Sequence, residues 1–190
     1  ISGIEKYYNE ILKNDENEAL ELSLDSAVQS EVYEILLNQF IKHSAKAASV
    51  IIMDSNSGEI VSLVNFPDFN PNFRDSLKRK NTFNTATSAV YELGSIFKIF
   101  TVANALSSSK ISFFDQFDAR KPLKIGKHKI SDFHAKKKIM TIPEILVHSS
   151  NIGTALVADT LGGKAMKAFY QKLNLLEPIK IDLPENSPPM

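Results

Sequence analysis

The sequence of 190 residues contains no cysteine, and its 22 basic and 22 acidic residues cancel to a net charge of zero. The absence of cysteine excludes disulfides and thiol chemistry, and it fits either side of a membrane. With no net charge, no bulk field favours nucleic acid or a membrane surface as a partner. No apolar run reaches the roughly 20 residues of a transmembrane helix, and no signal peptide is visible.

The rest of the composition is that of an ordinary globular chain. Hydrophobic residues make up 43%, enough for a real core, and the length fits one domain or part of a larger one. Lysines gather in Lys78-Arg79-Lys80 and in Lys136-Lys137-Lys138, and such triplets are usually solvated loops. Because the chain starts inside an expected helix and ends on Pro188-Pro189-Met190, we expect it to be a piece of a longer protein.

Hydrophobic spacing in the first third of the chain predicts helices and a β-hairpin. Asp25 or Ser26 can cap the longest of these helices. Its expected inward-facing residues are Val28, Val32, Ile35, Leu36 and Phe40. The expected elements are a helix over Ile1 to Lys13, a half-buried strand over Leu20 to Leu24, a helix ending near His43, a central strand over Ala47 to Asp54, and its hairpin partner over Glu59 to Val64.

The remainder of the chain reads as mostly helical. The prolines of the loop over residues 66–72 prevent regular structure there, and residues 111–138 look irregular and basic, with short strand-like pieces such as Pro122 to Ile125. Helices are expected after Gly94, from a Thr141 cap to His148, over Ile152 to Leu161, and over Lys164 to Leu173, followed by an extended tail. A hairpin, several helices and no later strands give a mixed α/β (α+β) fold with an incomplete sheet.

Two polar residues open the apolar helix that follows Gly94. Ser95 and Lys98 are three positions apart and therefore lie on one helix face. Burial disfavours the charged form of a lysine, and a neutral lysine beside a serine can take its proton and make it a nucleophile. The same Ser-x-x-Lys spacing recurs from Ser107 to Lys110, where it reads as a helix end running into a turn.

A second polar pair, Ser149 and Asn151, lies at a predicted junction between helices. A serine hydroxyl there could pass a proton between Lys98 and a leaving amine, and an asparagine amide suits contact with a peptide. The alternative is that Ser149, Ser150 and Asn151 only cap the helix beginning at Ile152.

These motifs together resemble the transpeptidase domain of class B penicillin-binding proteins, with Ser-x-x-Lys followed by Ser-x-Asn. Further likeness lies in Asp54-Ser-Asn-Ser-Gly-Glu-Ile, Phe66-Pro-Asp-Phe-Asn-Pro-Asn, Tyr91-Glu-Leu-Gly-Ser and Leu183-Pro-Glu. The resemblance covers about Leu20 to Glu185. It predicts a partial transpeptidase domain over residues 20–190, with residues 1–19 as the end of a preceding non-catalytic module and linker. Ser-Ser-Asn-Ile-Gly at residues 149–153 is closer to the division (septal) branch than to the elongation branch.

The resemblance implies a role for each matching residue. Ser95 would be the nucleophile, acylated by the D-Ala-D-Ala end of a peptidoglycan stem peptide or by a β-lactam, and its N–H would form half of an oxyanion hole. Lys98 would be the general base, Ser149 the proton relay and Asn151 a substrate contact. The implied enzyme is a serine-type D,D-transpeptidase without metal or cofactor. It would act on the outer (periplasmic) face of the cytoplasmic membrane, with its anchor outside this chain and with other cell-division proteins as partners.

The sequence departs from the family pattern at a few points. Leu93 stands where proline is usual, and Ile96 where a small hydroxyl residue is common. No Lys-Thr-Gly, Lys-Ser-Gly or His-Thr-Gly occurs, although in the family this third motif supplies the other oxyanion donor. Loss of one such donor lowers the rate by about 10²–10³, so we expect the 190-residue chain alone to be inactive or nearly so. The alternatives are a non-catalytic scaffold and a β-lactam-sensing or β-lactamase relative of the same fold.

Overall fold

The computed structural model describes residues 3–14, 19–70, 72, 83–183 and 188. They form two compact units: one contains the described residues up to Val90 together with those from Pro178 onward, and the other spans Tyr91–Glu177. The boundary expected between residues 19 and 20 adjoins residues 15–18, which lie outside the described residues, and it stays a prediction. None of the described helices is both long and apolar enough to cross a membrane.

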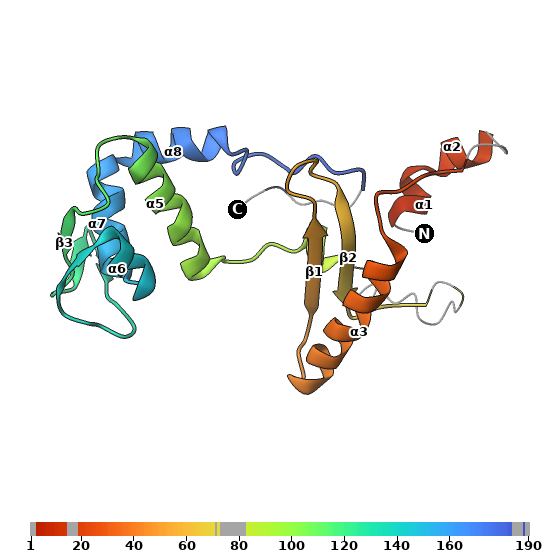
Figure 1. The fold of residues 1–190 in the computed structure, drawn as a ribbon, viewed down its shortest axis with the longest axis horizontal. Coiled ribbons are helices and arrows are strands. Elements are labelled where there is room, and N and C mark those ends of the chain that lie inside the picture. The colour runs from red at the N-terminus through yellow and green to blue at the C-terminus, as the bar shows by residue number, and fades with distance from the viewer. Residues whose placement is uncertain (1–2, 15–18, 71, 73–82, 184–187, 189–190) are drawn as a thin grey trace. The chain divides into compact units, whose positions relative to one another are not determined.

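The first unit contains a β-hairpin with a long helix beside it (Figure 1). Strands β1 and β2 pair antiparallel, with Ala48 opposite Phe66 and Val50 opposite Val64. The elements of the first unit are α1 (Gly3–Tyr7), α2 (Asn9–Asn14), α3 (Ser26–Lys42), β1 (Ala48–Met53), β2 (Ile60–Phe66) and α4 (Thr85–Ser88).

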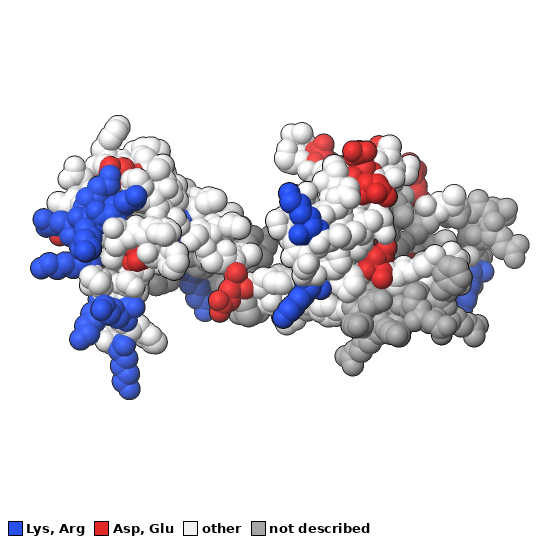
Figure 2. All heavy atoms as spheres, turned by 90° about the horizontal axis from the view of Figure 1, so that it is seen from below, with Lys and Arg blue, Asp and Glu red and all other residues white. Residues whose placement is uncertain are grey.

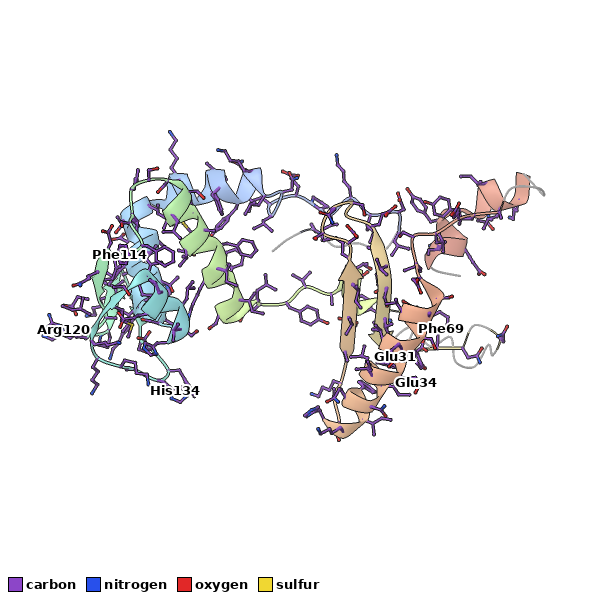
Figure 3. All side chains as sticks on the ribbon, viewed as in Figure 1. Glu31, Glu34, Phe69, Phe114, Arg120 and His134 are labelled. Carbon is purple, nitrogen blue, oxygen red and sulfur yellow. The ribbon has the colours of Figure 1, made fainter. Side chains whose placement is uncertain are left out.

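Helix α3 begins where the sequence predicts it. The Asp25 carboxylate accepts hydrogen bonds from the N–H groups of Ala27 and Val28, at 2.8 and 3.0 Å, and so satisfies the free donors of the first turn. Phe40 stacks on Phe66 of β2, with ring centroids 5.3 Å apart, which fixes the helix against the hairpin. Glu31 and Glu34 lie exposed on α3 (Figure 3).

Several expectations for this unit are wrong. Residues 20–24 form no strand, and the first helix is broken at Tyr8 into α1 and α2. Ile35 is 55% exposed instead of facing inward. Among the described residues β1 pairs with β2 alone, and its Ile51, Ile52 and Met53 are exposed, so it is not a central strand here.

The second unit packs helices against two small sheets (Figure 1). The strand-like piece expected over Pro122 to Ile125 is confirmed by β4, but the expectation of no later strands is wrong, because β3 pairs with β6 and β4 with β5, all antiparallel. Strands of three residues are too short to leave a period in the sequence. The elements are η2, a 3₁₀ turn (Gly94–Phe97), α5 (Lys98–Ser107), β3 (Gln116–Asp118), β4 (Leu123–Ile125), β5 (His128–Ile130), β6 (Ile139–Thr141), α6 (Ile142–Val147), α7 (Asn151–Leu161) and α8 (Gly163–Lys172).

The core of this unit lies between α5, α6 and α7. Ile142, Ile145 and Val157 are fully buried, and burying each such side chain contributes about 1.5–3 kcal/mol. Helix α6 begins at the predicted Thr141 cap, where the Glu144 carboxylate accepts the Thr141 N–H at 2.9 Å. The core residues are Val102, Ala105, Ile111, Ala119, Met140, Ile142, Ile145, Ile152, Val157 and Leu161.

Lysine and arginine side chains gather on the surface of this second unit (Figure 2). Lys136 and Lys137 are exposed in a loop, as predicted, whereas Lys138 forms an ion pair with Glu144 at 2.6 Å. The other triplet, residues 78–80, lies outside the described residues.

Candidate active site

Ser95 lies in the 3₁₀ turn η2, directly before α5. Gly94 opens this turn with a φ of 57°, a left-handed conformation that glycine adopts without strain. Ser95 is exposed, and its carbonyl accepts the backbone N–H of Lys98, the first residue of α5. The expected buried helix is therefore confirmed only in part, since Ser95 precedes it in an exposed turn and Ile99 is 57% exposed.

Lys98 reaches across to the turn between α6 and α7. Its Nζ donates to the Ser149 carbonyl oxygen at 2.5 Å and lies 2.9 Å from Ser149 Oγ. Lys98 is half-buried, and desolvation lowers the pKa of its amine, partly opposed by the negative charge of Asp132. The structure therefore brings together two of the residues predicted for catalysis, one from each motif.

The turn that carries Ser149 has a left-handed backbone. Ser149 has a φ of 50°, and its N–H donates to the carbonyl of Leu146 at 3.0 Å, closing the end of α6. The side chain is exposed, and its contact with Lys98 is the hydrogen bond described above. A capping role for Ser149 is wrong, because the cap of α7 is the next residue.

Ser150 is that cap. Its Oγ accepts the N–H of Gly153 at 2.9 Å, and its side chain is only 1% exposed. Asn151, predicted to contact substrate, is exposed and donates one amide hydrogen to the Ser131 carbonyl at 2.9 Å. Its second N–H and its carbonyl oxygen can still serve a ligand.

Sequence reasoning missed Asp132. Its Oδ2 accepts the Ser150 hydroxyl and its Oδ1 accepts the Ile152 N–H, both at 2.9 Å. The residue lies in residues 111–138, which the sequence predicts to be irregular and basic, and no spacing rule joins it to its partners. Among the described residues no group of three or more His, Asp or Glu side chains is placed to hold a metal ion.

Gly153→Ala is expected to destabilise the fold by about 1–3 kcal/mol through overpacking. A Cβ at Gly153 would lie 2.5 Å from Cγ1 and 2.9 Å from Cδ1 of Ile145, which is fully buried and cannot move aside freely. Urea unfolding of the two proteins measures the change. Gly163→Ala is the matched control, since a Cβ there meets nothing within 4 Å and a helix favours alanine. An unchanged stability of Gly153→Ala would contradict the close packing of α6 and α7.

Comparison with known protein families identifies one that matches this chain. The penicillin-binding protein transpeptidase domain matches residues 48–189 of the chain. The chain belongs to this family. The match includes all the predicted site residues and confirms the class B transpeptidase domain and the mixed α/β fold.

Individual relatives agree with the family. Probable peptidoglycan D,D-transpeptidase FtsI of Caulobacter vibrioides is 35% identical over 90% of this chain and 29% of its own length. Probable peptidoglycan D,D-transpeptidase PenA of Neisseria flavescens is 33% identical over 92% of this chain and 43% of its own length. The crystal structure of a peptidoglycan glycosyltransferase from Burkholderia ambifaria superposes with a TM-score of 0.75 at 28% identity, covering 88% of this chain and 49% of the other. The chain thus spans less than half the length of these relatives.

Proposed function

We propose that the intact protein is a peptidoglycan D,D-transpeptidase that cross-links stem peptides during cell-wall synthesis at division. The observation that carries the proposal is the hydrogen bond between Lys98 Nζ and Ser149 Oγ at 2.9 Å, in the same compact unit as Ser95. This hydrogen bond links a residue of the Ser-x-x-Lys motif to a residue of the Ser-x-Asn motif. The printed names of the FtsI and PenA relatives support the reaction class.

In the proposed acylation, Ser95 Oγ attacks the carbonyl carbon of the penultimate D-Ala and gives its proton to Lys98. Ser149 hands a proton from Lys98 to the amine of the terminal D-Ala, which leaves as the C–N bond breaks. An amine of a neighbouring peptidoglycan strand then attacks the carbonyl carbon of the Ser95 ester. The new C–N bond forms the cross-link, the ester C–O bond breaks, and Ser95 Oγ regains its proton from the attacking amine through Lys98. A β-lactam would follow only the first half, by opening of its ring amide. No metal or cofactor takes part in the proposed steps.

The hydrogen bonds of Lys98 suit the role of base. A neutral amine has two hydrogens and one lone pair, so it can donate to both Ser149 oxygens and keep the lone pair for the Ser95 proton. Desolvation lowers the pKa of Lys98 and so increases the share of this neutral form. The exposure of Ser95 leaves the nucleophile open to a peptide.

The proposal extends to partners and place. Asn151 would contact the stem-peptide amide, and β-lactams and other cell-division proteins would be further partners. Residues 20–190 would be part of the transpeptidase domain and residues 1–19 the end of a preceding module. The protein would act on the outer face of the cytoplasmic membrane, held by an anchor outside this chain.

Labelling with a fluorescent penicillin tests the proposal directly. The intact protein is expected to gain the mass of one opened β-lactam, with the adduct mapped to Ser95 by peptide mass spectrometry. Ser95→Ala is expected to lose the adduct completely. Ser107→Ala is the matched control, because Ser107 opens the second Ser-x-x-Lys and is expected to label like the wild type.

Each other outcome points to a different function. An intact protein that never labels would refute the enzyme and favour the scaffold. A protein that labels at Ser95 but transfers no stem peptide to an amine acceptor would favour a β-lactam-sensing relative.

A further inference from the structure

The loop that carries Asp132 lies against the start of α7. It spans residues 131–138 between β5 and β6, and His134, labelled in Figure 3, belongs to it. Both carboxylate oxygens of Asp132 are used: Oδ2 accepts the Ser150 hydroxyl and Oδ1 the Ile152 N–H, each at 2.9 Å. Hydrogen bonds to an ionised acceptor are about twice as strong as neutral ones. The two hydrogen bonds of Asp132 therefore hold the start of α7 strongly against the loop.

The two hydrogen bonds of Asp132 hold the residues that directly follow Ser149. Ser150 is 1% exposed, and its hydroxyl donates to Asp132 while it accepts the Gly153 N–H. Next to it, the Ser131 carbonyl accepts from Asn151. Ser149 immediately precedes this anchored stretch, with a φ of 50° and its hydroxyl oxygen 2.9 Å from Lys98 Nζ.

Asp132 also acts on Lys98 through space. Its negative charge raises the pKa of the amine, against the larger lowering caused by desolvation. Helix α5 packs against α6, α7 and α8. Their titratable side chains are Glu144 and His148 around α6, Asp159 on α7, and Lys164, Lys167, Tyr170 and Lys172 on α8. Of these groups and the loop residues in the described part of the chain, only Asp132 shifts the pKa of Lys98 by its charge.

We propose that Asp132 is a positioning residue of the site. It anchors the Ser149 turn through Ser150 and Ile152, and the negative charge of its carboxylate favours the ammonium form of Lys98. The inference rests on the proposed function. It assigns two separable tasks to one side chain. Anchoring depends on the hydrogen bonds of the carboxylate, whereas stabilising the ammonium form of Lys98 depends on its negative charge.

Two variants of the intact protein separate these tasks. Asp132→Asn removes the charge and keeps an oxygen that can accept the Ile152 N–H. Ser150→Ala removes the hydroxyl link and keeps the charge. Asp159→Asn is the matched control, since it removes an exposed carboxylate of α7 that does not shift the pKa of Lys98. Acylation by benzylpenicillin is measured across pH, and the Lys98 side chain is titrated by NMR with Lys98→Met to assign its signal.

Both Asp132→Asn and Ser150→Ala are expected to slow acylation by about 10–100-fold at the optimum, because a small misplacement of a reacting group has that effect. The acid limb of the pH profile reports deprotonation of Lys98. Removing the negative charge lowers the pKa of Lys98, so Asp132→Asn is expected to shift this limb and the NMR midpoint to lower pH. Ser150→Ala is expected to leave both midpoints in place, and Asp159→Asn to behave as wild type.

Wild-type rates and an unshifted Lys98 midpoint in Asp132→Asn would overturn the inference. A slow Asp132→Asn with the wild-type midpoint would overturn the electrostatic half of it, as would an equal shift in Ser150→Ala. If the wild-type protein is never acylated, the proposed function fails on its own. The NMR titration then still decides the inference, because it needs no turnover.

Discussion

Replacing Lys98 with methionine is expected to lower the second-order rate constant for acylation of Ser95 by about 10²–10⁴-fold, the usual contribution of general acid–base catalysis. Lys98 belongs to the Ser-x-x-Lys motif and contacts Ser149 of the Ser-x-Asn motif. Desolvation lowers the pKa of the Lys98 amine. Methionine keeps an unbranched side chain in the same half-buried place but offers no basic lone pair. Stopped-flow quenching or intact-mass sampling with a β-lactam measures the rate.

Lys98→Arg distinguishes a base from a mere positive charge. Arginine keeps the charge and the donors but is not deprotonated in proteins, so it is expected to be as slow as methionine. If Lys98 only anchored the Ser149 carbonyl, arginine would restore much of the rate, and the role of base would be wrong. Lys110→Met is the matched control, because Lys110 ends the second Ser-x-x-Lys and is exposed.

The two serine–lysine spacings show what a motif predicts and what it leaves open. Ser107 ends α5 and Lys110 lies in the turn after it, as the sequence predicts for a helix end. The first spacing was predicted to open a buried helix, yet Ser95 lies in a separate exposed turn. Burial depends on what packs against the helix, and a spacing of three residues cannot encode that.

Local features of the fold were predictable because they depend on neighbours in sequence. Asp25 caps α3 and Thr141 caps α6 through atoms two or three residues away. The strand expected over residues 20–24 failed for the opposite reason. Ser23 of that segment donates its hydroxyl to the Ile60 carbonyl of β2, and Asp25, just after the segment, donates its N–H to the Val61 carbonyl, but residues 20–24 form no regular ladder.

The features that escaped prediction join distant parts of the chain. Gln29 of α3 pairs its amide with the N–H and carbonyl of Leu63, 34 residues away, at 2.9 and 2.8 Å. Asp132 reaches partners 18 and 20 residues away. Such contacts exist only once the tertiary fold has formed, and neither hydrophobic period nor cap chemistry marks them in the sequence.

Replacing Ser149 with alanine is expected to slow acylation by about 10²-fold, the lower end of the acid–base range, and to leave the fold intact. The backbone carbonyl of Ser149, 2.5 Å from Lys98 Nζ, remains after the substitution, so Lys98 keeps one of its two anchors. The loss then isolates the hydroxyl, whose proposed task is to carry a proton to the leaving amine. Acylation rates of β-lactams with leaving groups of different basicity measure it.

The left-handed backbone at Ser149 needs its own controls, since a φ of 50° is strained for alanine. Ser149→Gly relieves that strain and still lacks the hydroxyl, so it is expected to be as slow as Ser149→Ala. Ser109→Ala makes the same change at another exposed serine with a φ of 56° and is expected to keep the wild-type rate. Recovery of the rate in Ser149→Gly would assign the loss to backbone strain and would exclude Ser149 as the proton relay.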